Sequence, residues 1–204
     1  MVAAPGAPLR LTLVRHGETE WSLSGRHTGR TEIALTAQGE DGARALEPHL
    51  RGVAFARVLA SPRVRAQRTC ALAGLGPAEI EPDLAEWDYG DYEGLRSAEI
   101  HKDRPGWNIF RDGCPGGESP DEVAARADRL LGRLRASGGD VALFSHGHFG
   151  RALAARWIGQ PVSLGQHLAL SVSSISILGF EASHRETPAL ALWNFSPSAK
   201  PWSA

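Results

Sequence analysis

The sequence predicts an α/β fold, a three-layer α/β/α sandwich built around a mostly parallel sheet. Three short apolar runs carry this prediction, at residues 9–14 (LRLTLV), 56–60 (ARVLA) and 140–145 (DVALFS). Each run has the length of a buried strand and is followed, directly or after a loop, by a segment with helical periodicity. Strands that alternate with helices form layered and largely parallel sheets.

The length and composition are those of an ordinary globular protein. With 204 residues the chain can bury a full core, and we expect one domain spanning residues 1–204. Its residues are 42% hydrophobic and 22% charged, with a net charge of -1. This balance argues against nucleic acid or a membrane as a partner, because neither an anionic polymer nor an anionic lipid would attract it. Basic residues nevertheless outnumber acidic ones between Arg10 and Arg68, which suits a small anionic ligand.

The first half of the chain predicts two strand–helix units. After the first strand, Thr36 can cap a helix that ends at Gly52 and buries one face, formed by Ala43, Leu46 and Leu50. After the second strand, Ser61 and Pro62 provide an N-cap and a proline at the first helical position.

The second half predicts a long helix, a third strand–helix unit and a final pair of strands. Ser119 and Glu122 form a capping box in SPDE, and the helix that follows has an apolar face of Val123, Ala127, Leu130 and Leu134. The third strand is followed by a helix to about Ile158. Residues 171–178 and 189–195 have the pattern of strands.

Residues 84–118 form an insertion rich in glycine, proline, aromatic and acidic residues, with at most a short helix near 97–103. We interpret this insertion as a lid over one end of the sheet rather than as a second domain. Trp107, Ile109 and Phe110 can form a wall of the lid or belong to ordinary core packing.

Two of the predicted strands end in the same kind of polar junction. LTLV runs into Arg15 and His16, VALF runs into a serine and His146, and a glycine follows each histidine. If the two strands are parallel in one sheet, both histidines open onto the crevice where α/β folds bind ligands. The glycines allow the backbone to approach a ligand closely.

Each histidine alone has a plainer interpretation. A histidine at a strand end is most often a surface residue or a satisfied buried one. HGH at 146–148 suggests a metal site, but the sequence has no HExxH helix and no carboxylate spaced to complete a coordination shell, so we expect no metal. Cys70 and Cys114 have no CxxC spacing, which argues against a disulfide framework and a thiolate metal site.

Two further segments supply the other groups of an anion site. Arg65 lies in the first turns of the helix after the second strand, where its guanidinium can hold a phosphate through two N–H groups. Arg63 and Arg68 point elsewhere on that helix and are expected to be solvated. Glu86 lies among aromatic residues in LAEWDYGDYEG, and a carboxyl packed against aromatic surface has the raised pKa that a proton donor needs. Spacing alone does not distinguish it from its acidic neighbours Asp83, Asp88, Asp91 and Glu93.

An ordered set of motifs connects these segments. RHGETEW, SPRVRAQRT, LAEWDYGDYEG, GGES and SHG, in this order, resemble the histidine phosphatase superfamily, also called the phosphoglycerate-mutase-like family. The resemblance covers the chain from Leu11 to about Arg156. It depends on the whole set, because RHG alone is weak evidence.

The resemblance implies phosphoryl transfer to a histidine without a metal or any other cofactor. His16 matches the histidine that is phosphorylated, and it must be neutral, with its far ring nitrogen donating to a carbonyl. Arg15, Arg65 and a protonated His146 match the groups that surround the phosphoryl oxygens. Glu86 matches the acid/base, which protonates the leaving group and then deprotonates the attacking water.

Two departures from the family's mutases favour hydrolysis and leave mutase activity as the alternative. Mutases commonly have Glu-Arg-His-Tyr-Gly where this chain has EWDYG. Trp87 and an anionic Asp88 therefore stand at the positions where Arg and His would help to hold a second phosphate-bearing acid. The frequent Trp-Asn after RHG is Trp21-Ser22 here, and Ser22 keeps one hydrogen bond but loses the reach of the amide.

Finer similarity concerns the substrate. TEWS, HTG, EWDYGDYEG, RDGCPGGE and SHGH look most like the branch that contains sedoheptulose-bisphosphatase and broad-range acid phosphatases. This resemblance implies a small phosphorylated substrate, such as a sugar phosphate or bisphosphate. Thr28, Gly29, Gly147 and His148 are candidates for contacts with the near phosphate or the sugar. The candidate cations for a second phosphate, each with a plain surface alternative, are Arg26, Arg30, Lys102 and Arg111.

The ends of the chain carry no targeting signal in their pattern. MVAAPGAP lacks the basic and apolar stretches of a signal peptide, and no apolar run has the length that crosses a membrane. We therefore expect a cytoplasmic protein, and a homo-oligomer stays open. The tail from Ser196 is expected to be loose.

Overall fold

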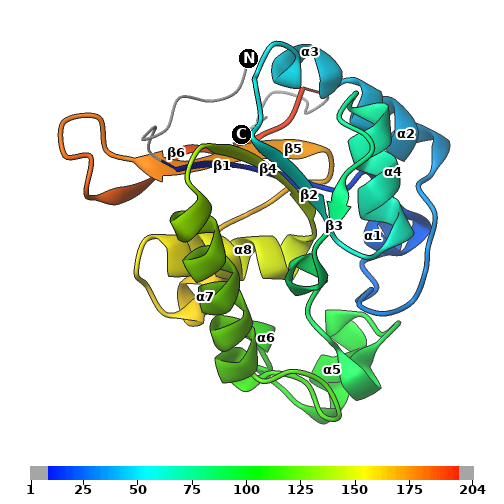
Figure 1. The fold of residues 1–204 in the computed structure, drawn as a ribbon. Helices are drawn as coiled ribbons and strands as arrows, with labels where there is room; N and C mark the ends of the chain where they lie inside the picture. The colour runs from blue at the N-terminus through cyan, green and yellow to red at the C-terminus, as the bar shows by residue number, and fades with distance from the viewer. Residues whose placement is uncertain (1–8, 198–204) are drawn as a thin grey trace, which may run out of the picture.

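The computed structural model describes residues 9–197, and these contain one mixed sheet of six strands (Figure 1). The strands are β1 (Arg10–Arg15), β2 (Arg57–Ala60), β3 (Glu79–Ile80), β4 (Asp140–Ser145), β5 (Ser174–Phe180) and β6 (Pro188–Phe195). Their order across the sheet is β3-β2-β4-β1-β5-β6. β1, β2, β3 and β4 pair in parallel, whereas β5 pairs antiparallel with both β1 and β6. The predicted mostly parallel sheet is confirmed, with an antiparallel pair at one edge.

Helices cover both faces of the sheet (Figure 1). One face carries α2 (Ala37–Arg44), α3 (Glu47–Leu50) and α4 (Val64–Leu72), and the other carries α7 (Pro120–Ser137) and α8 (Gly147–Trp157). Each face has its own apolar core. Val14 and Phe144 pack on the side of α3 and α4, whereas Leu13 and Leu143 pack on the side of α7 and α8. Successive strand residues therefore face opposite layers, as a three-layer sandwich requires.

The helix predicted between Thr36 and Gly52 is two helices. Thr36 caps α2 as predicted, its side chain accepting a hydrogen bond from the Gly39 N–H. α2 stops at Arg44 because Pro48 has no N–H to donate to the Arg44 carbonyl and its ring crowds that carbonyl. The chain continues as α3, and the predicted face remains buried across both helices, at Ala43, Leu46 and Leu50.

The prediction that Ser61 and Pro62 begin the next helix is wrong. α4 begins at Val64, and its N-cap residue, Arg63, makes no capping bond with its side chain. Glu32, from the loop before α2, accepts the Val64 N–H instead and pairs with Arg63. A cap that comes from a distant loop leaves no signal in the local sequence.

The insertion at 84–118 contains short elements and packs against the body of the molecule. It follows η1 (Pro82–Leu84) and includes η2 (Gly90–Tyr92), the predicted short helix α5 (Ser97–Asp103) and α6 (Ile109–Asp112), which was not predicted. Trp107, Ile109 and Phe110 are buried in the core that α7 and α8 share, so their main role is packing.

The last part of the chain matches the predicted elements. Ser119 and Glu122 form the capping box of α7, α8 ends at Trp157, and η3 (Val162–His167) leads to the predicted strand pair. The N-terminal MVAAPGAP and most of the tail after Ser196 lie outside the described residues. No helix between residues 9 and 197 combines the length and the apolar character needed to cross a membrane.

Candidate active site

The C-terminal ends of β1 and β4 bring two histidines together. The strands are parallel neighbours with Arg15 opposite Ser145, so His16 and His146 leave the sheet side by side. The centroids of the two imidazole rings are 5.1 Å apart. β2 lies parallel to β4 on the other side and ends at the same edge. The two His-Gly junctions therefore open onto one crevice.

Both glycines make room for neighbouring protein groups. A Cβ atom on Gly17 would lie 2.4 Å from the Gly39 carbonyl oxygen, so this glycine allows α2 to pack against β1. A Cβ atom on Gly147 would lie 3.2 Å from Cζ of Arg15. The expectation that the glycine admits a ligand to the backbone is therefore corrected for Gly17, whereas Gly147 lines the pocket beside His16.

His16 is held as a neutral side chain with one free nitrogen. Its ring is buried, and Nδ1 donates to the Gly17 carbonyl at 2.7 Å, which leaves the lone pair on Nε2. Burial lowers the pKa of His16 well below its usual value, and the charges of Arg65 and Arg15 lower it further. Thr69 fixes Gly17 from the other side, because its Oγ1 accepts the Gly17 N–H at 3.0 Å.

Arg15 and Arg65 bring positive charge to the histidines without a carboxylate partner. Arg65 is fully buried and donates to three carbonyl groups at 2.9–3.1 Å, those of Thr28, Gly29 and Thr31. Arg15 is half-buried and donates to the Leu170 carbonyl. Burial lowers the pKa of both guanidinium groups, and the nearby Glu86 opposes this effect. Within the described residues, neither arginine forms an ion pair.

His146 is the N-cap residue of α8 and is fully buried. Its Nε2 lies 2.7 Å from Oγ of Ser61, whereas its Nδ1 has no partner. Burial lowers the pKa of His146 well below its usual value, and Arg65, His16 and Arg15 lower it further. This direction runs against the expectation of a protonated His146.

Three buried nitrogen atoms in this crevice lack a hydrogen-bond partner. They are Nε of Arg15, Nε of Arg65 and Nδ1 of His146. The fourth unpartnered buried nitrogen in the described part of the chain is Nε of Arg63, whose guanidinium forms an ion pair through its tip. Folded proteins rarely leave buried donors unpaired. Three of them around His16 fit an anion with several acceptor oxygens.

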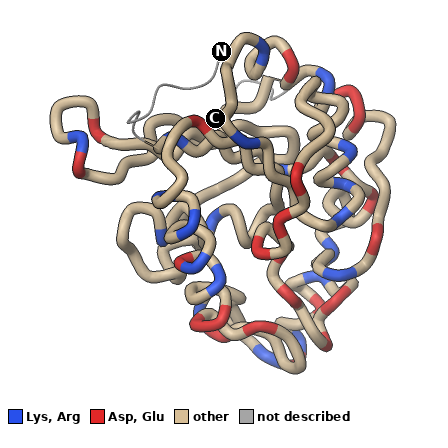
Figure 2. Tube along the Cα trace, in the orientation of Figure 1, with Lys and Arg blue, Asp and Glu red and all other residues tan. Residues whose placement is uncertain are grey.

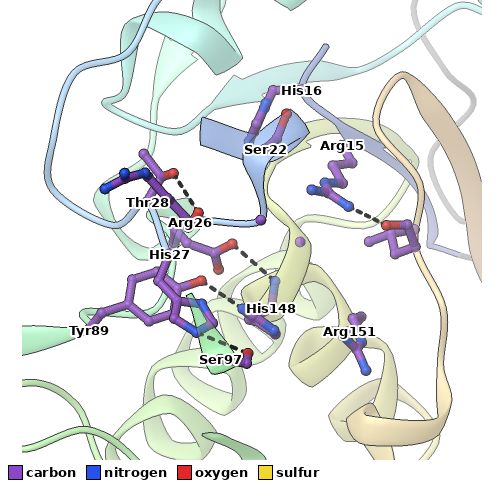
Figure 3. A pocket seen from close by; sticks show the side chains of 14 residues that line it. Arg15, His16, Ser22, Arg26, His27, Thr28, Tyr89, Ser97, His148 and Arg151 are labelled. Atoms are coloured by element: carbon purple, nitrogen blue, oxygen red, sulfur yellow. Dashed lines mark hydrogen bonds between the residues drawn. The ribbon is translucent and has the colours of Figure 1, made fainter. Parts of the chain in front are cut away.

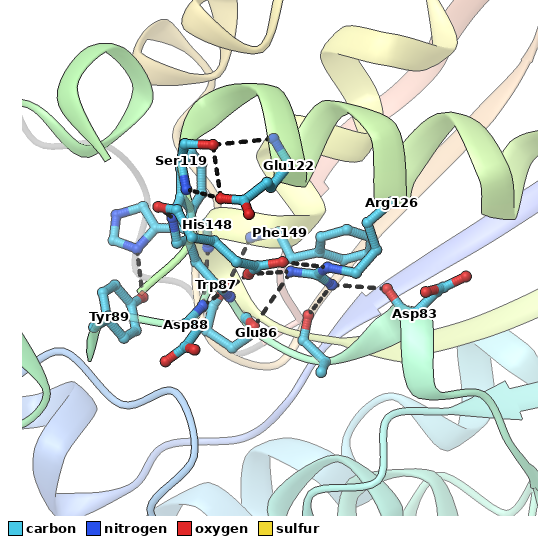
Figure 4. Close-up of polar contacts among 12 residues, drawn as sticks. Asp83, Glu86, Trp87, Asp88, Tyr89, Ser119, Glu122, Arg126, His148 and Phe149 are labelled. Carbon is cyan, nitrogen blue, oxygen red and sulfur yellow. Dashed lines mark hydrogen bonds and ion pairs between the residues drawn. The ribbon is translucent and has the colours of Figure 1, made fainter. Parts of the chain in front are cut away.

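Glu86 faces the same crevice, but backbone N–H groups hold its carboxyl (Figure 4). Oε1 accepts from Trp87 at 2.9 Å and from Phe149 at 2.7 Å, and Oε2 accepts from His148 at 3.0 Å. The last two donors belong to the first turn of α8, where a helix has unpaired N–H groups. The sequence interpretation, which rested on the neighbouring aromatic residues, did not predict these backbone donors. Oε2, with one donor, is the oxygen with room for a further hydrogen bond.

A family model described as the histidine phosphatase superfamily (branch 1) matches residues 11–195. The chain belongs to this superfamily. An acid phosphatase of Mycobacterium tuberculosis is 44% identical over 187 residues, which cover 90% of this chain and 92% of that protein. Sedoheptulose 1,7-bisphosphatase of Saccharomyces cerevisiae is 38% identical, with 76% of this chain and 69% of that protein covered. A 2,3-bisphosphoglycerate-dependent phosphoglycerate mutase of Methylobacterium radiotolerans is also 38% identical, with 70% and 76% covered.

The fold of this histidine phosphatase agrees with that of a solved relative. The structure of an open reading frame of Mycobacterium tuberculosis superposes with a TM-score of 0.85 at 42% identity, covering 92% of this chain and 98% of that one. The resemblance stated from the motifs is confirmed. The phosphatases among the relatives indicate a hydrolase that acts on phosphate esters.

The pocket of this histidine phosphatase opens beside His16 (Figure 3). Its walls include five of the predicted substrate-binding residues, namely Ser22, Arg26, Thr28, Gly147 and His148. They also include four that the sequence patterns did not single out, namely His27, Tyr89, Ser97 and Arg151. The helical spacing between His148 and Arg151 on α8 is a signal that could have found the arginine.

Several pocket residues already form hydrogen bonds with other parts of the protein. Ser22 closes the capping box of α1 (Glu20–Ser24), so its hydroxyl proton already goes to the Thr19 carbonyl. Arg26 donates one N–H to the Gly94 carbonyl. Arg151 donates to two carbonyl groups and stacks on an aromatic ring, with Gly165, Gln166 and Phe110 as its partners.

Tyr89 and two histidines form a neutral wall of the pocket. Burial raises the pKa of Tyr89 well above its usual value, so the phenol keeps its proton, and its oxygen lies 2.6 Å from Nδ1 of His148. Burial lowers the pKa of His148 well below the usual value. His27 stacks on Tyr89 at 4.8 Å between ring centroids, and burial lowers its pKa to about 4.

Gly29 and Arg30, which were predicted to contact the substrate, stabilise their loop and lie outside the pocket beside His16. The Gly29 N–H donates to the Glu93 carboxylate at 2.9 Å, and Arg30 pairs with Asp88 at 2.6 Å. This ion pair also corrects the interpretation of Asp88 as a charge that repels a second acid. Asp88 is compensated, and both it and the buried Trp87 lie outside the pocket.

Arg111 and Lys102, which were predicted as contacts for a second phosphate, also lie outside the pocket beside His16. Arg111 is exposed on α6 and pairs with Asp112 at 2.7 Å, and Lys102 is exposed near the end of α5. Acidic and basic residues are mixed along the trace (Figure 2), and many surface arginines have such a partner. Their charge is therefore a poor guide to a binding role.

Arg126 supports the backbone that carries Glu86 (Figure 4), and its position on the predicted helix did not reveal this role. Its guanidinium pairs with Glu118 at 2.8 Å and lies 4.1 Å from the centroid of the Phe149 ring. It also donates to three carbonyl groups, those of Asp83, Ala85 and Glu86. Arg126 thereby ties α7 to the segment that enters the crevice.

No group of three or more His, Cys, Asp or Glu side chains between residues 9 and 197 is arranged to hold a metal ion. Cys70 and Cys114 are free and buried, and burial raises the pKa of each thiol to about 12. Neither thiol lines the pocket beside His16.

Proposed function

We propose that this histidine phosphatase hydrolyses small phosphomonoesters through a phosphohistidine intermediate on His16. The observation that carries the proposal is the set of three unpartnered buried nitrogens, from Arg15, Arg65 and His146, beside an imidazole with a free Nε2. Three fixed donors match the equatorial oxygens of a phosphoryl group during transfer. We assign Glu86 as the acid/base, because Oε2 has room for one more hydrogen bond at the edge of the pocket.

In the first step, Nε2 of His16 attacks phosphorus in line with the ester oxygen. The P–N bond forms as the P–O bond breaks, and Glu86 gives its proton to the departing oxygen. The Gly17 carbonyl stabilises the positive charge that develops on the imidazole. Arg15 and Arg65 stabilise the charge on the phosphoryl oxygens.

In the second step, water replaces the alcohol. Glu86, now a carboxylate, takes a proton from the water as its oxygen attacks phosphorus and the P–N bond breaks. The pair returns to neutral His16 and protonated Glu86, and inorganic phosphate leaves. Fixed guanidinium groups supply the charge stabilisation in both steps.

The outer part of the pocket supports sugar phosphates or sugar bisphosphates as substrates. Arg26 and Arg151 line it, and within residues 9–197 neither pairs with a carboxylate. Two such guanidinium groups suit a second phosphate. The yeast relative is named as a sugar bisphosphatase. Hydroxyl groups of a sugar suit the neutral polar wall formed by His27, Tyr89, Ser97 and His148.

Arg151→Met is expected to lower kcat/KM for sugar bisphosphates by about 10–100-fold, the value of a charge-assisted hydrogen bond. Hydrolysis of p-nitrophenyl phosphate, which has no second anionic group, should change by less than about 3-fold. Steady-state kinetics on both substrates measure the difference. Arg111→Met is the matched control, because Arg111 lies outside the pocket. Equal losses on the two substrates would contradict a second phosphate at Arg151.

Product analysis tests hydrolysis against the alternative, mutase activity. The enzyme is incubated with 3-phosphoglycerate, with and without 2,3-bisphosphoglycerate, and both inorganic phosphate and 2-phosphoglycerate are measured. We expect phosphate release from phosphomonoesters and no isomerisation, with turnover undiminished in EDTA. Isomerisation without phosphate release would overturn the proposal in favour of a mutase.

A further inference from the structure

Ser61 lies behind His146 in the crevice. It follows β2 directly and is fully buried, and its Oγ is 2.7 Å from Nε2 of His146. The same oxygen accepts the N–H of Arg63 at 3.2 Å. Within residues 9–197, Oγ has no other protein partner. The hydroxyl is therefore shared between one backbone donor and one imidazole nitrogen.

One placement of the protons gives the Ser61 hydroxyl both a donor and an acceptor. If Nε2 of His146 carried the ring proton, Ser61 would accept two hydrogen bonds and its own buried proton would have no acceptor. If Ser61 donates to Nε2, the hydroxyl is fully satisfied and the ring proton lies on Nδ1. The atom left without a partner is then the Nδ1–H group of His146, which is a donor. The other unpartnered atoms of the crevice, on Arg15 and Arg65, are also N–H donors.

The charge of His146 makes this choice of tautomer important. Burial and the charges of Arg65 and Arg15 hold its pKa well below the usual value. A nitrogen that accepts the Ser61 proton carries none of its own, so the imidazole in this arrangement is neutral. A neutral imidazole offers a proton from one nitrogen and a lone pair from the other. A lone pair on Nδ1 would repel a phosphoryl oxygen, whereas an N–H group would stabilise it.

We infer that Ser61 is a positioning residue, whose hydroxyl donates to Nε2 of His146 and thereby keeps the Nδ1–H group directed at a phosphoryl oxygen. His146 then stabilises the transition state as a neutral donor rather than as a cation. The inference rests on the proposed function, because it requires a phosphoryl group in the crevice.

Ser61→Ala tests the inference. Loss of a preorganised donor to a reacting oxygen typically costs about 100–1000-fold in kcat, and a mixture of tautomers loses only part of this, so we expect a loss of about 10-fold. KM for p-nitrophenyl phosphate should change less than kcat. In 15N-histidine-labelled protein, the His146 signals should change from the Nδ1–H tautomer to a mixture. Ser61→Thr, which keeps the hydroxyl, should restore both the rate and the tautomer.

Ser145→Ala is the matched control. Ser145 is as buried as Ser61 and precedes His146 in the chain, but its hydroxyl donates to the Leu84 carbonyl. We expect the tautomer of His146 to be unchanged in this variant. A wild-type kcat in Ser61→Ala, or an Nδ1–H tautomer that persists there, would overturn the inference. The proposed function would survive that result as long as His16→Ala is inactive, so the two failures are distinguishable.

Discussion

His16→Ala is expected to lower kcat by at least about 10⁴-fold, because the variant loses the atom that forms the P–N bond. The other groups of the crevice would still bind a phosphate ester, so binding should survive the loss of turnover. Phosphate release from p-nitrophenyl phosphate measures the rate, and isothermal titration with vanadate measures binding. Rapid quenching in base should trap a base-stable, acid-labile phosphate on the wild-type chain and none on the variant.

His184→Ala is the control for this experiment. His184 is exposed in the turn between β5 and β6 and lies outside the pocket, so turnover should stay at the wild-type value. Thermal unfolding of His16→Ala shows whether the variant is folded. Wild-type turnover in a folded His16→Ala protein would refute the phosphohistidine mechanism.

Glu86→Gln is expected to lower kcat by about 10²–10⁴-fold for sugar phosphates, since an amide cannot protonate a departing alkoxide. The loss should be much smaller for p-nitrophenyl phosphate, whose leaving group needs little protonation in the first step. The amide also replaces one acceptor oxygen by a donor in a site with three backbone donors. We therefore expect the variant to lose about 1–3 kcal/mol of stability as well.

The dependence on the leaving group separates the two effects. A purely structural loss lowers the rates for both substrates by the same factor, whereas loss of a general acid lowers the sugar phosphate rate more. Asp88→Asn is the matched control, because Asp88 is a neighbouring carboxylate outside the pocket. A series of aryl phosphates with different leaving groups gives the slope of the logarithm of the rate against the acidity of the leaving group. An unchanged slope in Glu86→Gln would remove Glu86 as the acid.

The parts of the fold that were predicted correctly depend on local signals. Strand length, the cap at Thr36 and the capping box at Ser119 act within a few residues of chain, so the sequence alone reveals them. The errors come from long-range contacts. The start of α4 depends on Glu32 from a distant loop, and α6 depends on how residues 84–118 pack against α7 and α8.

The same distinction holds for the candidate site. His16 and His146 were placed in one crevice from the strand pattern, because parallel neighbours end at the same edge of a sheet. The lowered pKa of His146 was not predicted, since burial and two arginines act on it only in the folded chain. Arg111 was chosen for its charge, but the path of the insertion places it outside the pocket, where it pairs with its neighbour Asp112.

The contacts of Arg15 and Arg65 have a consequence for product release. Both side chains give their N–H groups to carbonyl oxygens, which carry no net charge, so the cationic character of the crevice is preserved throughout the catalytic cycle. Orthophosphate is an anion, like the ester that produced it. The attraction that draws a substrate in therefore also retains the product, and escape of orthophosphate becomes a step that competes with chemistry for control of the rate.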